Sequence, residues 1–333
     1  MTKAIKLIFL LIGVALFVWA VQTVGLDELL QLLSKLGIGF IYILFIYAVV
    51  TFLDCISWKY NFTQSCAQRF NLFQIWRIRQ IGEAYNVITP LGTLGGEPAK
   101  AQLLKDYHDI PRRQGLASQI VSRTTFLAAL ILFFIPGIFL TFEAKNISSQ
   151  FQNTALAGMI IFSTAIFFFF LFQITGTLGR LARWAEKISW IKQSSSFSEN
   201  VDALSGHISA FYRENPKRVA ISIAFAFAGW VVGLAELYVA MYFLGVDLSL
   251  AELWIIEALA QLIKVGSFLI PLSIGAQEGG FIIVFTAMGL PPGIGLTLSF
   301  VRRIRELFWI GLGLLMAGQM EFKPVIDVLD ESE

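Results

Sequence analysis

Long apolar stretches alternate with short polar ones along this chain, and the longest have the length of membrane-spanning helices. About 20 apolar residues are needed to cross the hydrocarbon core of a bilayer. Leu26–Leu36 is shorter and amphipathic, so we predict that it lies at the membrane interface. The pattern indicates an all-α, polytopic membrane protein with six transmembrane helices, over residues 7–24, 38–58, 115–142, 155–174, 219–244 and 295–316.

The stretch 73–87 is too short and too polar to span a bilayer easily, and it runs into a loop rich in Gly and Pro. A similar loop interrupts the chain again between 252 and 289. The loops read PLGTLGGEPAK and PLSIGAQEGG. Broken helices at membrane depth are tolerated where protein or a cavity surrounds them. We therefore predict two re-entrant helical hairpins, the first over 73–87 and the loop at 90–100, the second over 252–270 and 279–289 around the loop at 271–280.

The two loops correspond to each other at an offset of 180 or 181 residues. Six positions match in the same order around the two loops. They predict an internal repeat, about 38–142 and about 219–318, within a single membrane domain over 1–333. Three predicted spans separate equivalent elements. Because an odd number of crossings reverses the direction in which the chain enters the membrane, the repeats are predicted to be inverted, an arrangement typical of secondary transporters. The six matched positions are Gln80 and Gln261, Pro90 and Pro271, Glu97 and Glu278, Pro111 and Pro291, Val121 and Val301, and Arg123 and Arg303.

Composition and charge agree with this interpretation. Charged residues make up only 14% of the chain and hydrophobic ones 56%, whereas a soluble domain is about 25% charged. In the predicted topology, 18 of the 25 Lys and Arg residues lie on the side of the N-terminus, among them Lys100 and Lys105 where the first hairpin leaves the membrane. The positive-inside rule then predicts a multi-pass protein of a bacterial or archaeal cell membrane with a cytoplasmic N-terminus.

Four charges inside apolar surroundings form the candidate site: Glu97, Arg123, Glu278 and Arg303. An ionised side chain at the bilayer centre costs about 2.5–3.5 kcal/mol, so these groups must be paired or face a wet cavity. Arginine suits a phosphate and glutamate suits an amine or a proton. We predict a substrate-binding role for these four residues, for Arg302, and for the glycines that allow close approach of a backbone or headgroup, Gly95, Gly96, Gly279 and Gly280. The alternative is that each Glu–Arg pair only ties a hairpin to its neighbouring span.

The sequence contains no motif for metal binding, cysteine chemistry or nucleotide binding. His108 and His207 show no metal-ligand spacing, Cys55 and Cys66 read as apolar filler, and GxxxxGK[ST] is absent. We therefore expect no catalytic residue, no metal, no cofactor and no nucleic acid. A phosphate that displaced a glutamate from its arginine would leave an acid that can take up a proton, which would couple phosphate binding to pH.

Three segments carry a family resemblance: GGEPAKA at 95–101, IGAQEGG at 274–280, and LPPG followed by SFVRRIRELFW between 290 and 309. The chain resembles, from about Lys3 to Gln319, the membrane domain of lysylphosphatidylglycerol synthase/flippase and its stand-alone flippase-like relatives, some of which are linked to hopanoid or glycolipid trafficking. The full synthase carries a C-terminal soluble aminoacyl-transferase domain. Only 17 residues follow the last predicted span here, so that domain is expected to be absent.

The resemblance implies a flippase that moves an anionic or zwitterionic membrane lipid between leaflets. The alternative function is a membrane-embedded transferase or hydrolase of lipid headgroups, for which no nucleophile–base pair is evident, since neither histidine lies in a repeat loop. The expected partner is the lipid, and a homodimer is an assembly that the sequence leaves open. The lipid, the direction of movement and the driving force are also left open.

Overall fold

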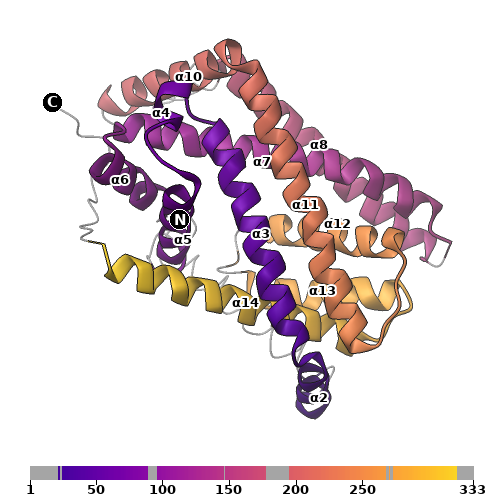
Figure 1. The fold of residues 1–333 in the computed structure, drawn as a ribbon. Helices are drawn as coiled ribbons and strands as arrows, with labels where there is room; N and C mark the ends of the chain where they lie inside the picture. The colour runs from indigo at the N-terminus through magenta and orange to yellow at the C-terminus, as the bar shows by residue number, and fades with distance from the viewer. Residues whose placement is uncertain are drawn as a thin grey trace. The chain divides into compact units, whose positions relative to one another are not determined.

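A computed structural model describes residues 22, 25–88, 96–145, 147–177, 195–267, 270 and 273–320. Its regular elements in these ranges are all helical, which confirms the predicted all-α class (Figure 1). The helices are α2 (Leu26–Leu36), α3 (Gly39–Tyr60), α4 (Gln64–Ala67), α5 (Leu72–Ile88), α6 (Gly96–His108), α7 (Arg112–Glu143), α8 (Ser149–Ile174), α10 (Ser195–Glu214), α11 (Pro216–Leu244), α12 (Leu250–Gly266), α13 (Ala276–Ala287) and α14 (Pro292–Gly318).

Four of these helices are long and apolar enough to cross a membrane: α3, α7, α8 and α11. They correspond to four of the six predicted spans. The last predicted span is helix α14, 27 residues long, which contains the charged run from Arg302 to Glu306. The first predicted span, at 7–24, lies outside the described residues except for residue 22, and so do residues 90–95 of the first repeat loop and residues 271–272 of the second.

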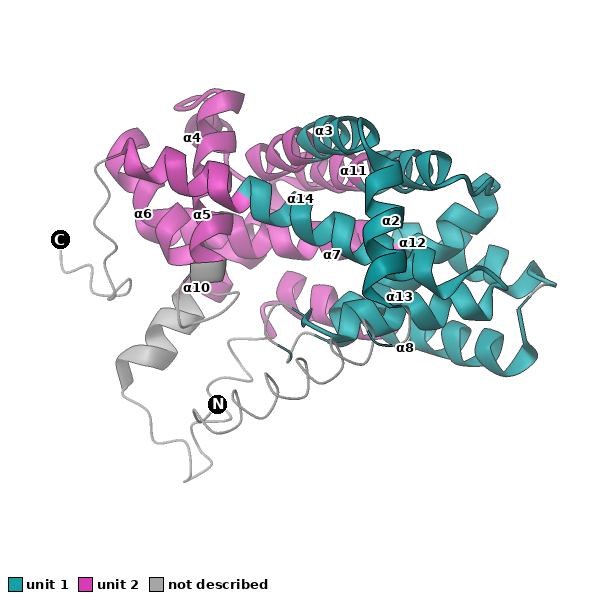
Figure 2. Ribbon diagram, turned by 90° about the horizontal axis from the view of Figure 1, so that it is seen from below, with its two compact units in different colours: residues 1–50, 132–163, 230–309 teal, residues 51–131, 164–229, 310–333 magenta. Residues whose placement is uncertain are grey.

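The chain divides into two compact units (Figure 2). The unit boundaries fall inside α3, α7, α8, α11 and α14. Unit 2 contains α5 and α6, which pack against each other, and the first part of α7. Unit 1 contains α12 and α13, which also pack against each other, and most of α14. Each unit therefore holds one predicted hairpin with the start of the long helix that follows it. Unit 1 comprises 1–50, 132–163 and 230–309, and unit 2 comprises 51–131, 164–229 and 310–333.

Hydroxyl and amide groups link the apolar helices of unit 2. Ser57 of α3 and Ser222 of α11 have their Oγ atoms 2.9 Å apart, and Ser222 also donates to Thr125 of α7 at 3.0 Å. Asn61 donates to the same Thr125 hydroxyl at 3.2 Å. Such bonds satisfy polar groups that water does not reach, so they hold α3, α7 and α11 in a defined register.

Packing in unit 1 rests on aromatic and aliphatic side chains. Trp254 of α12 stacks on Phe133 of α7 with ring centroids 4.7 Å apart, and its indole N–H donates to the Phe133 carbonyl. Leu29 of α2 packs against Ile282 and Leu296, on α13 and α14. The amphipathic face predicted for 26–36 is therefore covered by two helices of the same unit.

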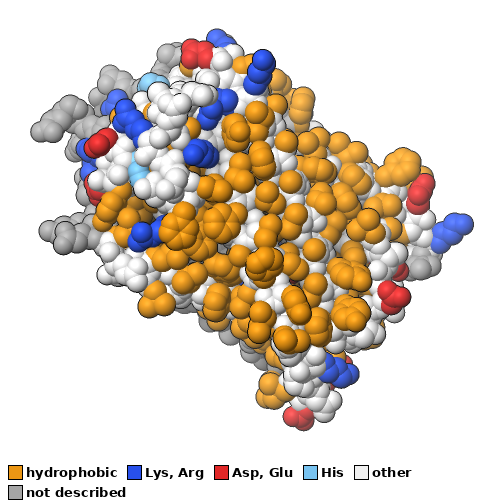
Figure 3. Space-filling model, viewed as in Figure 1, with side chains coloured by type: hydrophobic (Ala, Val, Ile, Leu, Met, Phe, Trp, Pro, Cys, Tyr) orange, Lys and Arg blue, Asp and Glu red, His pale blue; other side chains and the backbone are white. Residues whose placement is uncertain are grey.

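The surface is apolar along the long helices. Figure 3 shows hydrophobic side chains covering α3 and α11, with charged groups gathered near helix ends. On α14 the exposed apolar residues lie on one face, whereas Arg302 and Arg305 are buried at 7% exposure each. Soluble proteins show the reverse distribution of charge and apolar groups. The exposed face of α14 consists of Ile304, Leu307, Phe308, Leu314 and Leu315.

Candidate functional site

One predicted ion pair lies in unit 2, between the hairpin and the helix that follows it. Glu97 is the second residue of α6, and Arg123 lies eleven residues after the start of α7. The Arg123 guanidinium donates from Nη2 to Glu97 Oε1 at 2.8 Å. The Arg123 side chain is 56% exposed and that of Glu97 only 19%. The cation of this pair can therefore be reached from outside the protein.

Lys100 contacts the same acids, although the sequence predicted that this residue lies where the first hairpin leaves the membrane. It is 6% exposed, and its Nζ lies 2.6 Å from Glu83 Oε1 and 3.9 Å from Glu97 Oε1. The reason is Gly82 on α5: a Cβ there would lie 2.3 Å from Lys100 Cε. The absence of a side chain at Gly82 leaves room for the lysine stem to turn inward.

A further pair joins α3 to α5. Arg79 Nη2 lies 2.8 Å from Asp54 Oδ2, and Arg79 Nη1 donates to the Gln80 side chain at 2.9 Å. Together with Asp54 and Arg79, the charged groups described so far in unit 2 are three carboxylates and three cations, and their formal charges sum to zero. We call them the unit 2 network: Asp54, Arg79, Glu83, Glu97, Lys100 and Arg123.

The second predicted pair has the same position in unit 1. Glu278 lies in the first turn of α13, and Arg303 lies eleven residues after the start of α14. Arg303 Nη2 and Glu278 Oε1 are 2.9 Å apart, and Glu278 Oε2 accepts from the Gly275 N–H at 2.7 Å. The Glu278 side chain is 1% exposed. Both of its oxygens are therefore engaged within the protein.

Arg302 and Arg305 form a buried quartet with two glutamates from α11 and α12. Arg302 donates to Glu257 and lies 3.6 Å from Glu236, while Arg305 donates to Glu236. Each side chain of the quartet is 9% exposed or less. Aromatic rings lie against both guanidiniums, Phe281 at 5.3 Å from Arg302 and Tyr47 at 4.1 Å from Arg305. The predicted site residue Arg302 is thus enclosed by acids and rings.

The two pairs have matching places in their elements but different surroundings. Each joins the first turn of the second hairpin helix to the eleventh residue after the start of the next long helix. The internal repeat and its inverted orientation stay predictions. At the repeat offset of 181, the residue matching Lys100 is Phe281 and the one matching Gly82 is Ile263. Unit 1 therefore has no counterpart of the buried lysine at this position.

Two of the predicted glycines pack hairpin helices together. A Cβ on Gly96 would lie 2.1 Å from the Gly82 carbonyl oxygen, and one on Gly280 would lie 2.6 Å from the Ile263 side chain. Protein rather than a headgroup fills the space beside these two residues. Gly279 is buried in α13, and Gly95 lies outside the described residues.

Gly96→Ala is expected to lower the free energy of unfolding by about 1–3 kcal/mol, because the methyl group would push α6 away from α5. The matched control is Gly233→Ala in α11, where among the described residues the added Cβ meets no heavy atom within 4 Å beyond the backbone of its own helix. Unfolding in mixed detergent micelles measures both. Equal stability of the two variants would contradict the close packing of α5 on α6.

Sequence reasoning missed the partners of these charges. Glu83, Lys100, Glu236 and Glu257 were not assigned to the site, and Arg305 was not distinguished from its neighbours. The available signal was the occurrence of acids within apolar stretches, as at Glu236 and Glu257. Which cation meets which acid depends on how the helices face one another, and that information is not local.

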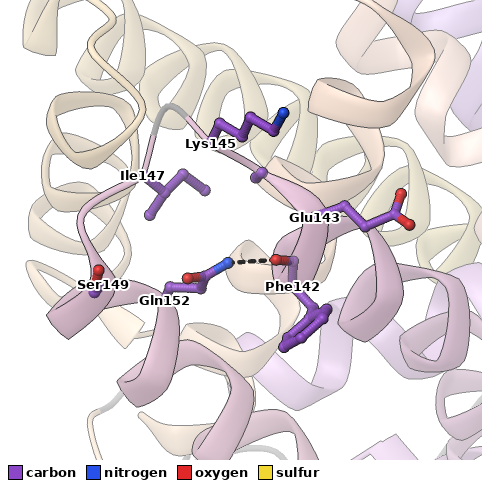
Figure 4. Close-up of a pocket in the computed structure, with 7 residues that line it drawn as sticks. Phe142, Glu143, Lys145, Ile147, Ser149 and Gln152 are labelled. Carbon is purple, nitrogen blue, oxygen red and sulfur yellow. Dashed lines mark hydrogen bonds between the residues drawn. The ribbon is translucent and has the colours of Figure 1, made fainter.

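An open pocket lies elsewhere, at the turn between α7 and α8 (Figure 4). Gln152 stabilises this turn by donating to the Phe142 carbonyl at 2.7 Å. The residues that line the pocket include Glu143 and Lys145 but none of the predicted site residues. We assign it no role.

Comparison with known proteins places the chain in a family. It matches the family model described as "Lysylphosphatidylglycerol synthase TM region" over residues 6–313. It is 25% identical over 250 residues to a UPF0104 membrane protein of Methanothermobacter thermautotrophicus, covering 69% of this chain and 70% of that protein. It is 20% identical over 314 residues to a UPF0104 membrane protein of Methanocaldococcus jannaschii, covering 91% of each. No solved structure matches the chain. The resemblance is thereby confirmed, and the chain is a multi-pass membrane protein that belongs to the lysylphosphatidylglycerol synthase TM region family.

Proposed function

We propose that this protein moves an intact lipid with a phosphate-containing headgroup between the leaflets of a cell membrane. The observation that carries the proposal is the pair of Arg123 and Glu97. A half-exposed guanidinium is held among apolar helices, with its partner acid largely buried. Structural ion pairs have no need of an exposed cation, whereas a binding site for a headgroup does.

The chemistry of the pair fits a lipid phosphate. A headgroup that enters the hydrocarbon region loses its hydration at a large free-energy cost. An arginine fork replaces part of that hydration, because its planar N–H groups match two phosphate oxygens. The apolar surface of α3, α8 and α14 lets the acyl chains stay in the bilayer while the headgroup moves along the protein.

The architecture that we propose for this movement is six spans with two re-entrant hairpins in an inverted repeat and a cytoplasmic N-terminus. The matching positions of Glu97 and Glu278, and of Arg123 and Arg303, support the repeat. In such transporters the two hairpins approach a central site from opposite faces of the membrane.

Reconstitution tests the proposal. Purified protein in liposomes is expected to make a fluorescent phospholipid of the inner leaflet accessible to a membrane-impermeant quencher, while liposomes without protein leave it protected. Mass spectrometry of the same lipids is expected to show them unchanged. Protection equal to that in protein-free liposomes would reject transport, and a cleaved or newly formed headgroup would support the transferase or hydrolase alternative.

A further inference from the structure

The two repeat-related glutamates differ in how their oxygens are used. Glu278 has one oxygen on Arg303 and the other on the Gly275 N–H. Glu97 instead offers a single oxygen, Oε1, to both Arg123 and Lys100. Its second oxygen, Oε2, is buried and has no hydrogen-bond partner among the described residues. Glu97 therefore has one carboxylate oxygen, Oε2, available to accept a hydrogen bond, and Glu278 does not.

A second unpaired acceptor lies beside Glu97. Gln119 of α7 donates from Nε2 to the Glu97 backbone carbonyl at 3.0 Å. Its own Oε1 is buried and has no partner in the described part of the chain, and the residue is 5% exposed. Buried polar atoms are almost always hydrogen-bonded, so an orphaned pair of acceptors next to an exposed guanidinium indicates a ligand that donates hydrogen bonds.

Lys100 supplies the cation that Glu97 would contact after a phosphate displaced it from Arg123. Its Nζ lies 3.9 Å from the same Glu97 oxygen that Arg123 binds, and 2.6 Å from Glu83. A small rotation of the Glu97 side chain would move its carboxylate from Arg123 to Lys100. Glu97 can then release Arg123 without standing alone as a buried charge and without taking up a proton.

We propose that the headgroup binds in unit 2, with its phosphate on Arg123 and its N–H or O–H donors on Glu97 Oε2 and Gln119 Oε1. Lys100 takes over Glu97 when the phosphate arrives. This inference rests on the proposed function and names the substrate class of that site. In unit 1 the position that matches Lys100 is Phe281, and Arg302 and Arg305 are buried against acids. Unit 1 therefore serves as the half that does not exchange ion-pair partners.

The net charge of the unit 2 network with a bound headgroup favours some lipid headgroups over others. The six charges of the unit 2 network sum to zero, and a phosphodiester adds one negative charge. An ammonium group on the same headgroup cancels it and also supplies N–H donors. A primary-amine headgroup therefore fits best, a glycerol headgroup supplies donors without the positive charge, and a choline headgroup supplies the charge without donors.

Native mass spectrometry of the detergent-solubilised protein tests this order. Phosphatidylethanolamine is expected to bind about tenfold more tightly than phosphatidylcholine, with phosphatidylglycerol between them, since each charge-assisted hydrogen bond lost costs about that factor. Equal binding of the three lipids would overturn the assignment of the two acceptors. Because binding is measured without transport, failure of this inference is distinguishable from failure of the proposed function.

Lys100→Met tests the charge transfer, because methionine keeps an unbranched stem beside Gly82 and removes the ammonium. It is expected to weaken phosphatidylglycerol binding about tenfold, since Glu97 would be left without a cation once the phosphate occupied Arg123. The charged groups in contact with Glu97 are Lys100 and Arg123, and Lys100 also contacts Glu83. Only Lys100 is changed.

Two further variants complete the test. Lys105→Met, at an exposed position of the same helix, is expected to bind as the wild type does. Glu83→Gln combined with Lys100→Met keeps the network neutral if the single variant folds poorly, and it is expected to show the same loss of phosphatidylglycerol binding. Wild-type binding of phosphatidylglycerol by both Lys100 variants would overturn the role of Lys100.

Discussion

Arg302→Met is expected to lower the free energy of unfolding by about 3–5 kcal/mol, the largest stability effect that we anticipate in this protein. The side chains of Arg302 and Glu257 are 8% and 5% exposed, and Glu236 lies 3.6 Å from the Arg302 Nε. Removing the guanidinium leaves two buried carboxylates to share Arg305. Breaking a buried pair by removing one partner is costly because the remaining charge stays desolvated.

The double variant Glu257→Gln with Arg302→Met separates charge from packing. Replacing both members of a buried pair is often nearly neutral, so most of the stability is expected to return. Unfolding by SDS titration in mixed micelles measures the wild type, the single variant and the double variant. A single variant as stable as the wild type, or a double variant less stable than the single one, would contradict the role of the quartet as a structural tie.

Arg123→Gln is expected to slow lipid movement by about 10- to 150-fold. A hydrogen bond to a charged group is worth about 1.5–3 kcal/mol, and 1.4 kcal/mol corresponds to a factor of ten. Glutamine keeps hydrogen-bonding capacity but cannot balance the phosphate charge. The measurement is the rate at which a fluorescent phospholipid becomes accessible to quencher in proteoliposomes, per folded molecule.

Arg303→Gln is the matched change in unit 1. It breaks the pair with the fully buried Glu278, so it is expected to cost more stability than Arg123→Gln and to slow movement less per folded molecule. Lys105→Met is expected to move lipid at the wild-type rate. If Arg123→Gln moved lipid as fast as Lys105→Met, the exposed guanidinium would have no part in transport.

The helices could be predicted from the sequence because their signal is local. Apolar length gave the span at 38–58, which is observed as α3 over Gly39–Tyr60, and the span at 219–244, which is observed as α11 over Pro216–Leu244. The break in apolar pattern at each Gly/Pro loop likewise gave the two packed pairs, α5 with α6 and α12 with α13. Length and composition decide these features without reference to the rest of the chain.

The charge partners could be predicted only where the repeat supplied long-range information. Agreement between the two halves singled out Glu97 with Arg123 and Glu278 with Arg303, and the structure pairs them, while their role in binding stays a prediction. No such agreement marks Lys100, whose burial depends on a missing side chain at Gly82 on another helix. A cation that turns inward looks the same in sequence as one that reaches water.

The neutrality of the charge networks also bears on the electrical behaviour of the protein. In unit 1 four carboxylates face four cations, Glu236, Glu257, Glu278 and Glu306 with Lys264, Arg302, Arg303 and Arg305, and the unit 2 network is balanced as well. Exchange of partners inside a balanced network carries little charge across the membrane, so a crossing lipid contributes only its own charge. The membrane potential acts on that charge by about 2.3 kcal/mol per 100 mV. A zwitterionic lipid would therefore distribute between leaflets without regard to voltage, whereas an anionic lipid would be driven toward the positive side of the membrane.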